Sequence, residues 1–367
     1  MRLEELDTPC LVLEHGRVAA NAARLRTHLA SLGVPLRLHV KTAKSPDVAA
    51  LVLAGEKAPI TVSTLKEAEQ FFDAGYRDIL YAVGFARHKL ARAQALAGRG
   101  AKLTLLVDSV AAARSITGFP VLIEVDADGH RAGVKPDDEA QLVAIARALE
   151  TGGCVAAGVL THAGGSYGCA STTEITTLAE RERAGAVAAA RALRRAGFAA
   201  PTVSVGSTPT AHYARSLDGV TEVRAGVYVF FDLVMAGIDV CAQEDIALSV
   251  LATVIGHRAD KGWILVDAGW MALSRDRGTA RQRVDQGYGM VCDLDGRPIP
   301  DLIVSDTNQE HGIVALRGGG APPDLPVGTR LRILPNHACA TGAQHERYHV
   351  VHASREIAAS WQRFGGW

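Results

Sequence analysis

Several absences narrow what this chain can be. Its 367 residues carry no excess of either charge, because Lys plus Arg and Asp plus Glu both number 39. Nothing global therefore attracts nucleic acid or an anionic membrane, and any charge selectivity must be local. The chain also lacks a run of 18 or more apolar residues, so we expect no membrane span and no membrane partner.

Cysteine pairs and a targeting segment are missing too. The six cysteines are scattered with no CxxC spacing, which argues against a disulfide framework and against a four-thiolate zinc site. The amino terminus has no basic region followed by an apolar core and a cleavage site, so it does not resemble a signal peptide. We therefore expect a cytoplasmic location.

What the chain does contain is typical of a globular enzyme. Apolar residues make up 48% and charged residues 21%, enough to bury a large core. The length fits two domains, unless most of the chain closes into one α/β barrel.

Between about residues 37 and 230, short apolar runs alternate with longer stretches of helical period, which indicates repeated βα units and a parallel sheet. Eight such units favour a (β/α)8 barrel, with an open doubly wound sheet as the alternative. The predicted strands are Leu36–Thr42, Ile60–Thr64, Asp78–Val83, Leu103–Ser109, Val121–Asp126, Val155–His162, Thr202–Ser207 and Glu222–Val229.

After about residue 237 the pattern changes to short strands separated by Gly, Pro and Asp turns, which indicates an antiparallel β domain. The predicted strands are Ile246–Val254, Trp263–Val266, Leu302–Val304, Leu331–Leu334 and Tyr348–Val351. We predict a barrel domain over 8–236 and a β domain over 237–367 that includes residues 1–7.

Polar residues follow the predicted barrel strands where each strand ends. Lys41 follows the first, Arg131 the fifth, His162 the sixth and Ser207 the seventh, while Tyr228 lies in the eighth. In a barrel all these positions face one mouth, where barrel enzymes place their chemistry. A lysine partly desolvated there suits Schiff-base chemistry, although an ordinary strand-end lysine reaching water is the simpler interpretation.

Two loops at this mouth have more than one interpretation. The turn within Val203–Ala211 carries Ser207 and Thr208 and could cradle a phosphate, or could be a simple helix N-cap. The segment Glu124–Gly133 holds two acids and a histidine that could bind a metal, but short acids beside a Gly turn more often stabilise the loop. Arg131 in that segment could hold a cofactor oxygen or a substrate carboxylate.

His337 and Cys339 are separated by one residue, so in extended geometry both side chains would point to the same face. A histidine and a thiolate suit an ion such as zinc and leave positions for water and substrate. A buried cysteine beside a hydrogen-bonded histidine is the alternative, and His345, His349 and His352 could supply a rival site. The run Val266–Gln282 could be an active-site lid or a subunit contact.

A resemblance joins these observations. The chain resembles the metal-activated branch of the fold-type III, alanine racemase-like pyridoxal enzymes, which contains dehydratases of D-serine and of 3-hydroxyaspartate and D-threonine aldolases. The matching blocks are Asp7–Pro9, His39–Ser45, Val62–Glu69, Thr161–Gly168, Val205–Ala211, Arg224–Asp232, Val266–Asp276 and Pro335–Cys339.

The resemblance implies pyridoxal 5'-phosphate and a divalent metal, Zn²⁺, Mn²⁺ or Co²⁺, as cofactors. It implies Lys41, His162 and Tyr167 as catalytic residues and His337 with Cys339 on the metal. The implied cofactor-binding residues are Lys41, Arg131, His162, Tyr167, Gly206, Ser207, Thr208, Gly226 and Tyr228. A homodimer is expected.

The wording of several blocks, among them KTAKS and the helix Glu180–Val187, is most similar to dehydratases of D-threo-3-hydroxyaspartate. The expected reaction is therefore the conversion of this 3-hydroxy-D-amino acid to oxaloacetate and ammonia. Ala43 stands where D-serine dehydratases and D-threonine aldolases usually carry a histidine. D-serine dehydratase, D-threonine aldolase and a non-catalytic pyridoxal-phosphate carrier are the alternatives, and a racemase would have no evident need for His337 and Cys339.

Overall fold

The computed structural model describes all residues, 1–367, and the chain forms two compact units. The barrel unit comprises Ala23–Lys41, Leu53–Gly226 and Gly366–Trp367. The sheet unit comprises Met1–Ala22, Thr42–Val52 and Val227–Gly365. No helix is long and apolar enough to cross a membrane.

Eight parallel strands close the barrel unit, because each pairs with the next and the first also pairs with the last. The strands are β2 (Leu36–His39), β3 (Ile60–Val62), β4 (Asp78–Tyr81), β5 (Lys102–Val107), β6 (Pro120–Val125), β7 (Val155–Thr161), β8 (Thr202–Val205) and β9 (Glu222–Ala225). This confirms the predicted (β/α)8 barrel over the open sheet. Every predicted strand is present, although most end two or more residues earlier than predicted.

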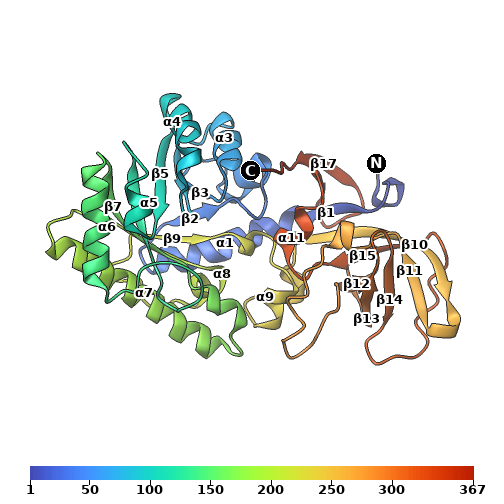
Figure 1. The fold of residues 1–367 in the computed structure, drawn as a ribbon. Helices are drawn as coiled ribbons and strands as arrows, with labels where there is room; N and C mark the ends of the chain where they lie inside the picture. Colours follow the sequence, from blue (N-terminus) through green and yellow to red (C-terminus); the bar gives the residue numbers. More distant parts are fainter. The chain divides into compact units, whose positions relative to one another are not determined.

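Helices connect these strands and lie outside them (Figure 1). Side-chain oxygens at the N-caps start five of them, where each accepts an N–H from the first helical turn. The five N-cap residues are Thr64, Ser109, Asp138, Ser171 and Ser207. The α-helices in or entering this unit are α1 (His15–Ser31), α3 (Leu65–Asp73), α4 (Leu90–Gly98), α5 (Val110–Ala113), α6 (Glu139–Thr151), α7 (Thr172–Arg195) and α8 (Thr208–Tyr213).

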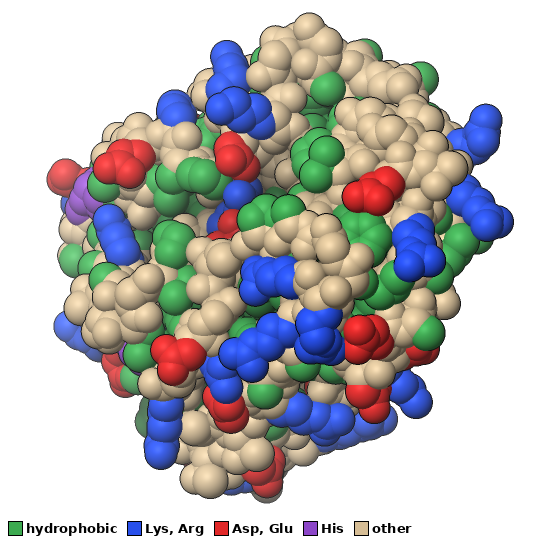
Figure 2. All heavy atoms as spheres, turned by 90° about the vertical axis from the view of Figure 1, so that its left-hand side faces the viewer, with side chains coloured by type: hydrophobic (Ala, Val, Ile, Leu, Met, Phe, Trp, Pro, Cys, Tyr) green, Lys and Arg blue, Asp and Glu red, His purple; other side chains and the backbone are tan.

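Charged side chains of β2 and β9 are paired within the barrel unit. Arg37 donates to Glu222 at 2.7 Å and to Asp78 at 2.8 Å, and Glu222 accepts the hydroxyl of Ser204 at 2.7 Å. Arg224, only 4% exposed, donates to that same hydroxyl at 2.8 Å. Pairing satisfies these groups, since a buried charge without a partner would be costly. On one outer face, acidic and basic side chains are both spread widely, consistent with the zero net charge (Figure 2).

Nine strands form the sheet unit, in the order β11-β14-β13-β12-β15-β10-β1-β16-β17. Since β10 also pairs with β11, six of them close into an antiparallel barrel, which β1, β16 and β17 extend. The strands are β1 (Cys10–Glu14), β10 (Leu248–Arg258), β11 (Trp263–Val266), β12 (Met290–Cys292), β13 (Pro298–Thr307), β14 (Gly312–Leu316), β15 (Arg330–Leu334), β16 (Arg347–Val351) and β17 (Ile357–Gln362).

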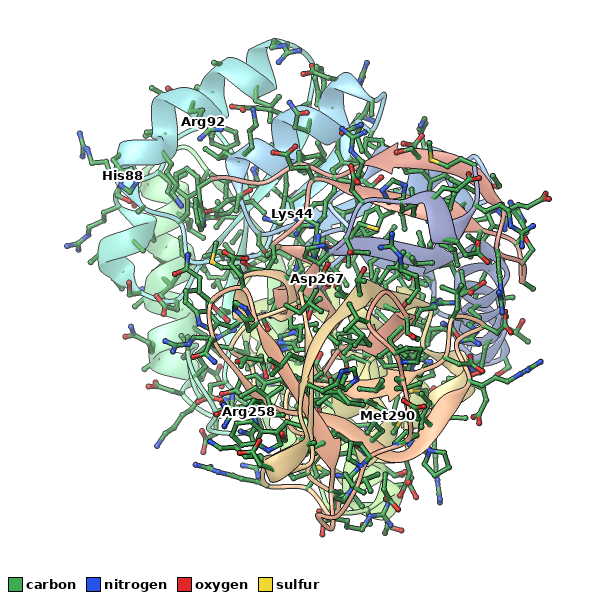
Figure 3. The ribbon with its side chains drawn as sticks, turned by 90° about the vertical axis from the view of Figure 1, so that its right-hand side faces the viewer. Lys44, His88, Arg92, Arg258, Asp267 and Met290 are labelled. Atoms are coloured by element: carbon green, nitrogen blue, oxygen red, sulfur yellow. The ribbon has the colours of Figure 1, made fainter.

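Strand β1 belongs to this sheet although it lies within the predicted barrel range 8–236. It pairs antiparallel with β10 and parallel with β16, and this is the one parallel pair of the sheet. Asp267 at the end of β11 accepts the Thr8 hydroxyl and the Thr253 N–H, which ties the chain start to the sheet (Figure 3). The predicted boundaries at 8, 236 and 237 stay a prediction. The remaining α-helices of the unit are α2 (Pro46–Val52), α9 (Leu233–Gly237), α10 (Trp270–Leu273) and α11 (Ala338–Gly342).

A buried ion pair crosses three strands of the sheet unit and gives a test of its stability. Arg332 donates to Glu14 at 2.7 Å and to the hydroxyl of Ser249 at 2.9 Å, and the two charged side chains are 3% and 8% exposed. Glu14→Ala should lower the free energy of unfolding by about 3–5 kcal/mol, because it leaves a buried guanidinium without its anion. Urea denaturation measures this change.

The matched control is Asp260→Ala, which removes an exposed pair with Arg258 from the same unit. Exposed pairs contribute little, so this variant should unfold at nearly the same urea concentration as the parent. Equal decreases in the free energy of unfolding of the two variants would show that the buried pair stabilises the protein no more than the exposed pair.

Candidate functional site

Lys41 lies two residues beyond β2, at the carboxyl end of the barrel strands, and is half-buried. Its backbone N–H donates to Nδ1 of His39 at 3.5 Å, and Nε2 of His39 lies 3.5 Å from the hydroxyl of Ser63. Burial first, and then the positive charge of Lys41, hold the pKa of His39 well below its usual range. A neutral imidazole therefore supports the backbone at this lysine.

His162 follows β7, and its Nδ1 lies 2.9 Å from the carbonyl oxygen of Gly206. Burial and the charge of Lys41 lower the pKa of His162 to about 3. The ring is therefore neutral at working pH, and since a carbonyl only accepts, Nδ1 carries the proton and Nε2 remains an acceptor. The Tyr167 ring lies 6.2 Å from it, centroid to centroid. Lys41, His162 and Tyr167 thus come together in the barrel unit.

Side chains of the Glu124–Gly133 segment hydrogen-bond to their own loop and to the loop after His162. Asp126 accepts the N–H of Gly129, and Asp128 accepts the N–H of Gly165 at 2.8 Å. A Cβ at Gly164 would lie 2.3 Å from the His130 ring, so only glycine allows this approach. The loop-stabilising interpretation of these acids fits what is seen, because both carboxylates accept backbone N–H groups of the loops.

The guanidinium of Arg131 is exposed and only weakly paired, so it can bind a further anionic group. Its side chain is 61% exposed and its nearest acid is Glu124 at 3.5 Å. Burial raises the pKa of that Glu124 carboxyl while Arg131 opposes the rise. A weakly paired cation close to His162, whose pKa it helps to lower, can still take a carboxylate or a phenolate oxygen.

The turn after β8 is held tightly. Gly206 has a φ of 138°, and a Cβ there would lie 2.1 Å from the carbonyl oxygen of Arg224, so only glycine fits. Ser207 is the N-cap of α8, where its hydroxyl accepts the Thr210 N–H at 3.2 Å and lies 2.8 Å from the hydroxyl of Ser166. Ser207 is therefore an N-cap, and Ser207 and Thr208 are buried at the strand end. The phosphate-binding interpretation of this turn stays a prediction.

Glu182 on α7 connects the loop after His162 with the turn at Gly206. The sequence pattern did not predict this role. One carboxylate oxygen accepts the N–H groups of Ala163 and Gly206, each at 3.0 Å, and the other accepts the Thr210 hydroxyl at 2.8 Å. The side chain is 2% exposed, and burial raises its pKa despite these hydrogen bonds. The His162 loop and the Gly206 turn are thus fixed to one helix.

Two further residues of the implied cofactor set follow β9. Gly226 comes directly after the strand, and Tyr228 lies in a one-turn helix, Val227–Val229, not in a strand as predicted. The strand ends at Ala225 because the chain turns there into this helix, where the Val227 carbonyl accepts the N–H groups of Phe230 and Phe231. Tyr228 is fully buried.

His337 and Cys339 lie in the sheet unit at the start of α11. The predicted reason for their convergence, an extended segment, was wrong: His337 is the extended N-cap residue and Cys339 is in the helix. Their side chains nevertheless contact each other. Burial disfavours the charged imidazole, yet hydrogen bonds to Asp276 and Cys339 raise the pKa of His337 to about 11. Cys339 Sγ also lies 3.3 Å from the hydroxyl of Thr42.

The rival histidines do not converge. Nε2 of His345 lies 2.9 Å from the carbonyl oxygen of Ala272, His349 lies half-buried on β16, and the His352 ring packs at 4.3 Å on that of His15. Each of the three has its own local surroundings. His337 and Cys339 remain the better pair of candidate metal ligands.

Pyridoxal 5'-phosphate fits the barrel residues. A half-buried lysine at the strand ends, a neutral histidine ring and a buried Gly-Ser-Thr turn supply an amine, a flat surface and a polar cradle. A divalent metal fits His337 and Cys339, whose imidazole nitrogen and thiolate suit a borderline-soft ion.

Comparison with known proteins decides the family. Residues 14–234 match the family described as "Alanine racemase, N-terminal domain", and residues 247–351 match "Putative serine dehydratase domain". The chain belongs to the D-serine dehydratase family of alanine racemase-like enzymes. The resemblance noted from the sequence blocks is thereby confirmed.

Members of this family with established activities align along the whole chain. D-threo-3-hydroxyaspartate dehydratase of Delftia sp. strain HT23 is 59% identical over 374 residues, which are 99% of this chain and 98% of the relative. Its structure superposes with a TM-score of 0.97 at 58% identity and full coverage of both chains. D-serine dehydratase of Dictyostelium discoideum is 31% identical, covering 100% of this chain and 98% of the relative.

Two solved variants of D-threo-3-hydroxyaspartate dehydratase bear on the metal. One replaces a histidine by alanine and has a TM-score of 0.98 at 58% identity, covering 100% of this chain and 97% of the variant. The other replaces a cysteine by alanine, is described as the metal-free form, and has a TM-score of 0.97 at 57% identity with full coverage of both chains. One residue separates the two replaced positions, as it does His337 and Cys339.

Proposed function

We propose that this chain is a pyridoxal-phosphate- and divalent-metal-dependent dehydratase that converts D-threo-3-hydroxyaspartate to oxaloacetate and ammonia. The observation that carries the proposal is the 59% identity to the Delftia enzyme over nearly the whole length of both proteins. The candidate residues on both units support it, because a pyridoxal carrier would need neither a metal pair nor a second unit.

The residues that would hold the cofactor are those that the barrel brings together and those that follow β9. Lys41 would bind it covalently, Arg131, His162 and Tyr167 would contact its ring, and the Gly206 turn with Gly226 and Tyr228 would hold its phosphate. When bound, the cofactor supplies an electron sink for the electron pair that stays on the substrate Cα when its proton is removed. Glu182 fixes both the His162 loop and the Gly206 turn. The residues that would contact the cofactor ring and those that would hold its phosphate therefore keep a fixed position relative to each other.

Lys41 is the base that we assign to the substrate Cα proton, which its Nζ would accept. The rings of His39 and His162 beside Lys41 are neutral, which supports this role. A positively charged ring would repel the proton that the amine takes from the substrate. His162 keeps Nε2 as an acceptor and does not change its protonation at working pH.

His337 and Cys339 would hold the divalent metal, which supplies a Lewis acid for departure of the β-hydroxyl. Two protein ligands leave coordination positions open for water and substrate. The metal-free form of the cysteine variant of D-threo-3-hydroxyaspartate dehydratase supports this assignment, because the histidine and cysteine replaced in the two solved variants have the same spacing. Zn²⁺, Mn²⁺ and Co²⁺ are all compatible with this donor pair.

The substrate gives the direct test. D-threo-3-hydroxyaspartate should have a higher kcat/KM than D-serine, which lacks the β-carboxylate. One charge-assisted contact contributes about 1.5–3 kcal/mol, so the preference should be on the order of tenfold to a hundredfold. Both values are measured at one pH and one metal concentration. Equal values or a preference for D-serine would make the chain a D-serine dehydratase.

Product identity and arginine variants sharpen this experiment. Oxaloacetate with ammonia indicates dehydration, whereas glycine with an aldehyde would indicate an aldolase. Arg277 is engaged by Asp285 at 2.7 Å, whereas Arg275 of the same segment lies over the Trp270 ring, 4.9 Å from its centre. Arg131, only weakly paired with Glu124, and Arg275 are therefore the better candidates for the β-carboxylate. Each of these two arginines is replaced by Gln, and the variant that lowers the ratio of the two kcat/KM values identifies the arginine that contacts the β-carboxylate.

A homodimer in the cytoplasm stays a prediction. Light scattering of the purified protein measures whether it is a dimer.

A further inference from the structure

The segment between β11 and β12 carries an acid that contacts the candidate metal pair. Asp276 Oδ2 lies 2.7 Å from His337 Nδ1, and the two side chains are 30% and 42% exposed. The other oxygen, Oδ1, accepts the Gly278 N–H at 2.8 Å. Because a carboxylate only accepts, Nδ1 of His337 carries the proton in this contact. A metal ion would then bind at Nε2, in place of the proton that this nitrogen carries in the metal-free protein.

The turn that bears Asp276 is shaped for this position. Ser274 has a φ of 76°, unusual for a residue with a side chain, and its buried hydroxyl accepts the Asp276 N–H at 3.2 Å. A Cβ at Gly278 would lie 2.5 Å from a methyl group of Val234, so a side chain would not fit there without a shift of Val234. The carboxylate is therefore held from both sides along the chain.

A second acid fixes the backbone between the two candidate ligands. Asp232 accepts the N–H of Ala338 at 3.0 Å with one oxygen and the N–H of Met235 at 3.0 Å with the other. It is 1% exposed. Asp232 thus fixes the backbone between His337 and Cys339. The contact with Asp276 fixes what remains variable, the orientation of the His337 ring.

We propose that Asp276 is a positioning residue of the metal site, which holds His337 with Nδ1 protonated and Nε2 turned to the ion. The proposal rests on the proposed function, in which His337 and Cys339 bind the metal. Carboxylates that accept the second ring N–H of a metal-binding histidine fix its orientation and make it a better donor. Removing them typically weakens metal binding by about 10–100-fold.

The test measures metal affinity, not turnover. The enzyme, loaded with pyridoxal phosphate and depleted of metal by a chelator, is titrated with Zn²⁺ against a chromophoric competing chelator. Asp276→Ala should bind Zn²⁺ about 10–100-fold more weakly than the parent. Asp276→Asn keeps a neutral acceptor of the same shape and should lose less. The visible absorbance of the bound pyridoxal phosphate should be unchanged in both variants.

Asp239→Asn is the matched control. Asp239 pairs at 2.8 Å with Arg283, a few residues beyond Asp276 on the same segment, and is 51% exposed. This variant removes a carboxylate that ties down the segment without touching His337, and its Zn²⁺ affinity should equal that of the parent. If Asp276→Ala fails to fold, the comparison between Asp276→Asn and Asp239→Asn decides.

Two outcomes would overturn the inference in distinguishable ways. Parent-like Zn²⁺ affinity in the folded Asp276 variants, with only a lower thermal midpoint, would make Asp276 a structural partner of His337. A parent whose Zn²⁺ affinity is unaffected by His337→Ala would instead remove the metal pair itself, and with it that part of the proposed function.

Discussion

Replacing Lys41 by alanine should abolish the visible absorbance of the bound cofactor and the activity together. Lys41 supplies both the amine that holds the cofactor and the base for the substrate Cα proton in the proposed function. Loss of a positioned general base alone costs about 10²–10⁴-fold in rate, so turnover should fall by at least that factor. Absorbance spectra of the protein mixed with pyridoxal phosphate, and an ammonia-release assay, measure the two effects.

The other lysines of the barrel unit are poor substitutes. Lys89 donates to the Tyr81 hydroxyl at 2.8 Å, and Lys57 lies 4.5 Å from the centre of the Tyr76 ring. Lys102 begins β5 and so lies at the opposite end of the strands from Lys41. Among the lysines, only Lys41 lowers the pKa of both His39 and His162 through its charge.

Lys66→Ala is the matched control for Lys41→Ala, because Lys66 also follows a barrel strand but lies in the first turn of α3. This variant should keep both absorbance and activity. A borohydride-reducible adduct of pyridoxal phosphate on another lysine in Lys41→Ala would contradict the assignment of Lys41.

The barrel was predictable because its strands are short apolar runs at regular intervals between long helical stretches. All eight were found, and with them the strand ends that carry Lys41 and His162. The sheet unit was harder to predict. Strands β1, β12, β14 and β17 were missed. Strand β12 has only three residues, and β17 alternates half-buried with exposed positions without a marked apolar face.

The two most informative acids of the candidate site were missed for a different reason. Glu182 lies in the charged run ERER, which predicts a solvated helix face, and its neighbours Glu180 and Arg183 do form an exposed pair. What distinguishes Glu182 is its contacts with the N–H groups of Ala163 and Gly206, on loops about 20 residues away on either side. Sequence pattern shows no signal for such contacts, nor for the approach of Asp276 to His337 across 61 residues.

Chelation of the metal, or the change His337→Ala, should remove most of the turnover while leaving the cofactor absorbance nearly intact. Lys41 and His162 belong to the barrel unit, and His337 and Cys339 belong to the sheet unit. Loss of His337 therefore leaves Lys41 and His162 in place. A Lewis acid contributes several kcal/mol to the transition state, so the rate should fall on the order of 10²-fold or more.

His349→Gln is the matched control for this experiment, because His349 belongs to the rival histidines and lies on β16 without contact to Cys339. It should retain nearly full turnover and its response to added metal. For the chelated parent, restoring Zn²⁺, Mn²⁺ or Co²⁺ should recover the rate, and the ion that does so at the lowest concentration is the one that the donor pair prefers. Full turnover in protein shown to be metal-free would refute the Lewis-acid role. His337 and Cys339 would then be structural residues at the start of α11, and the dehydration would have to proceed with the barrel residues and the cofactor alone.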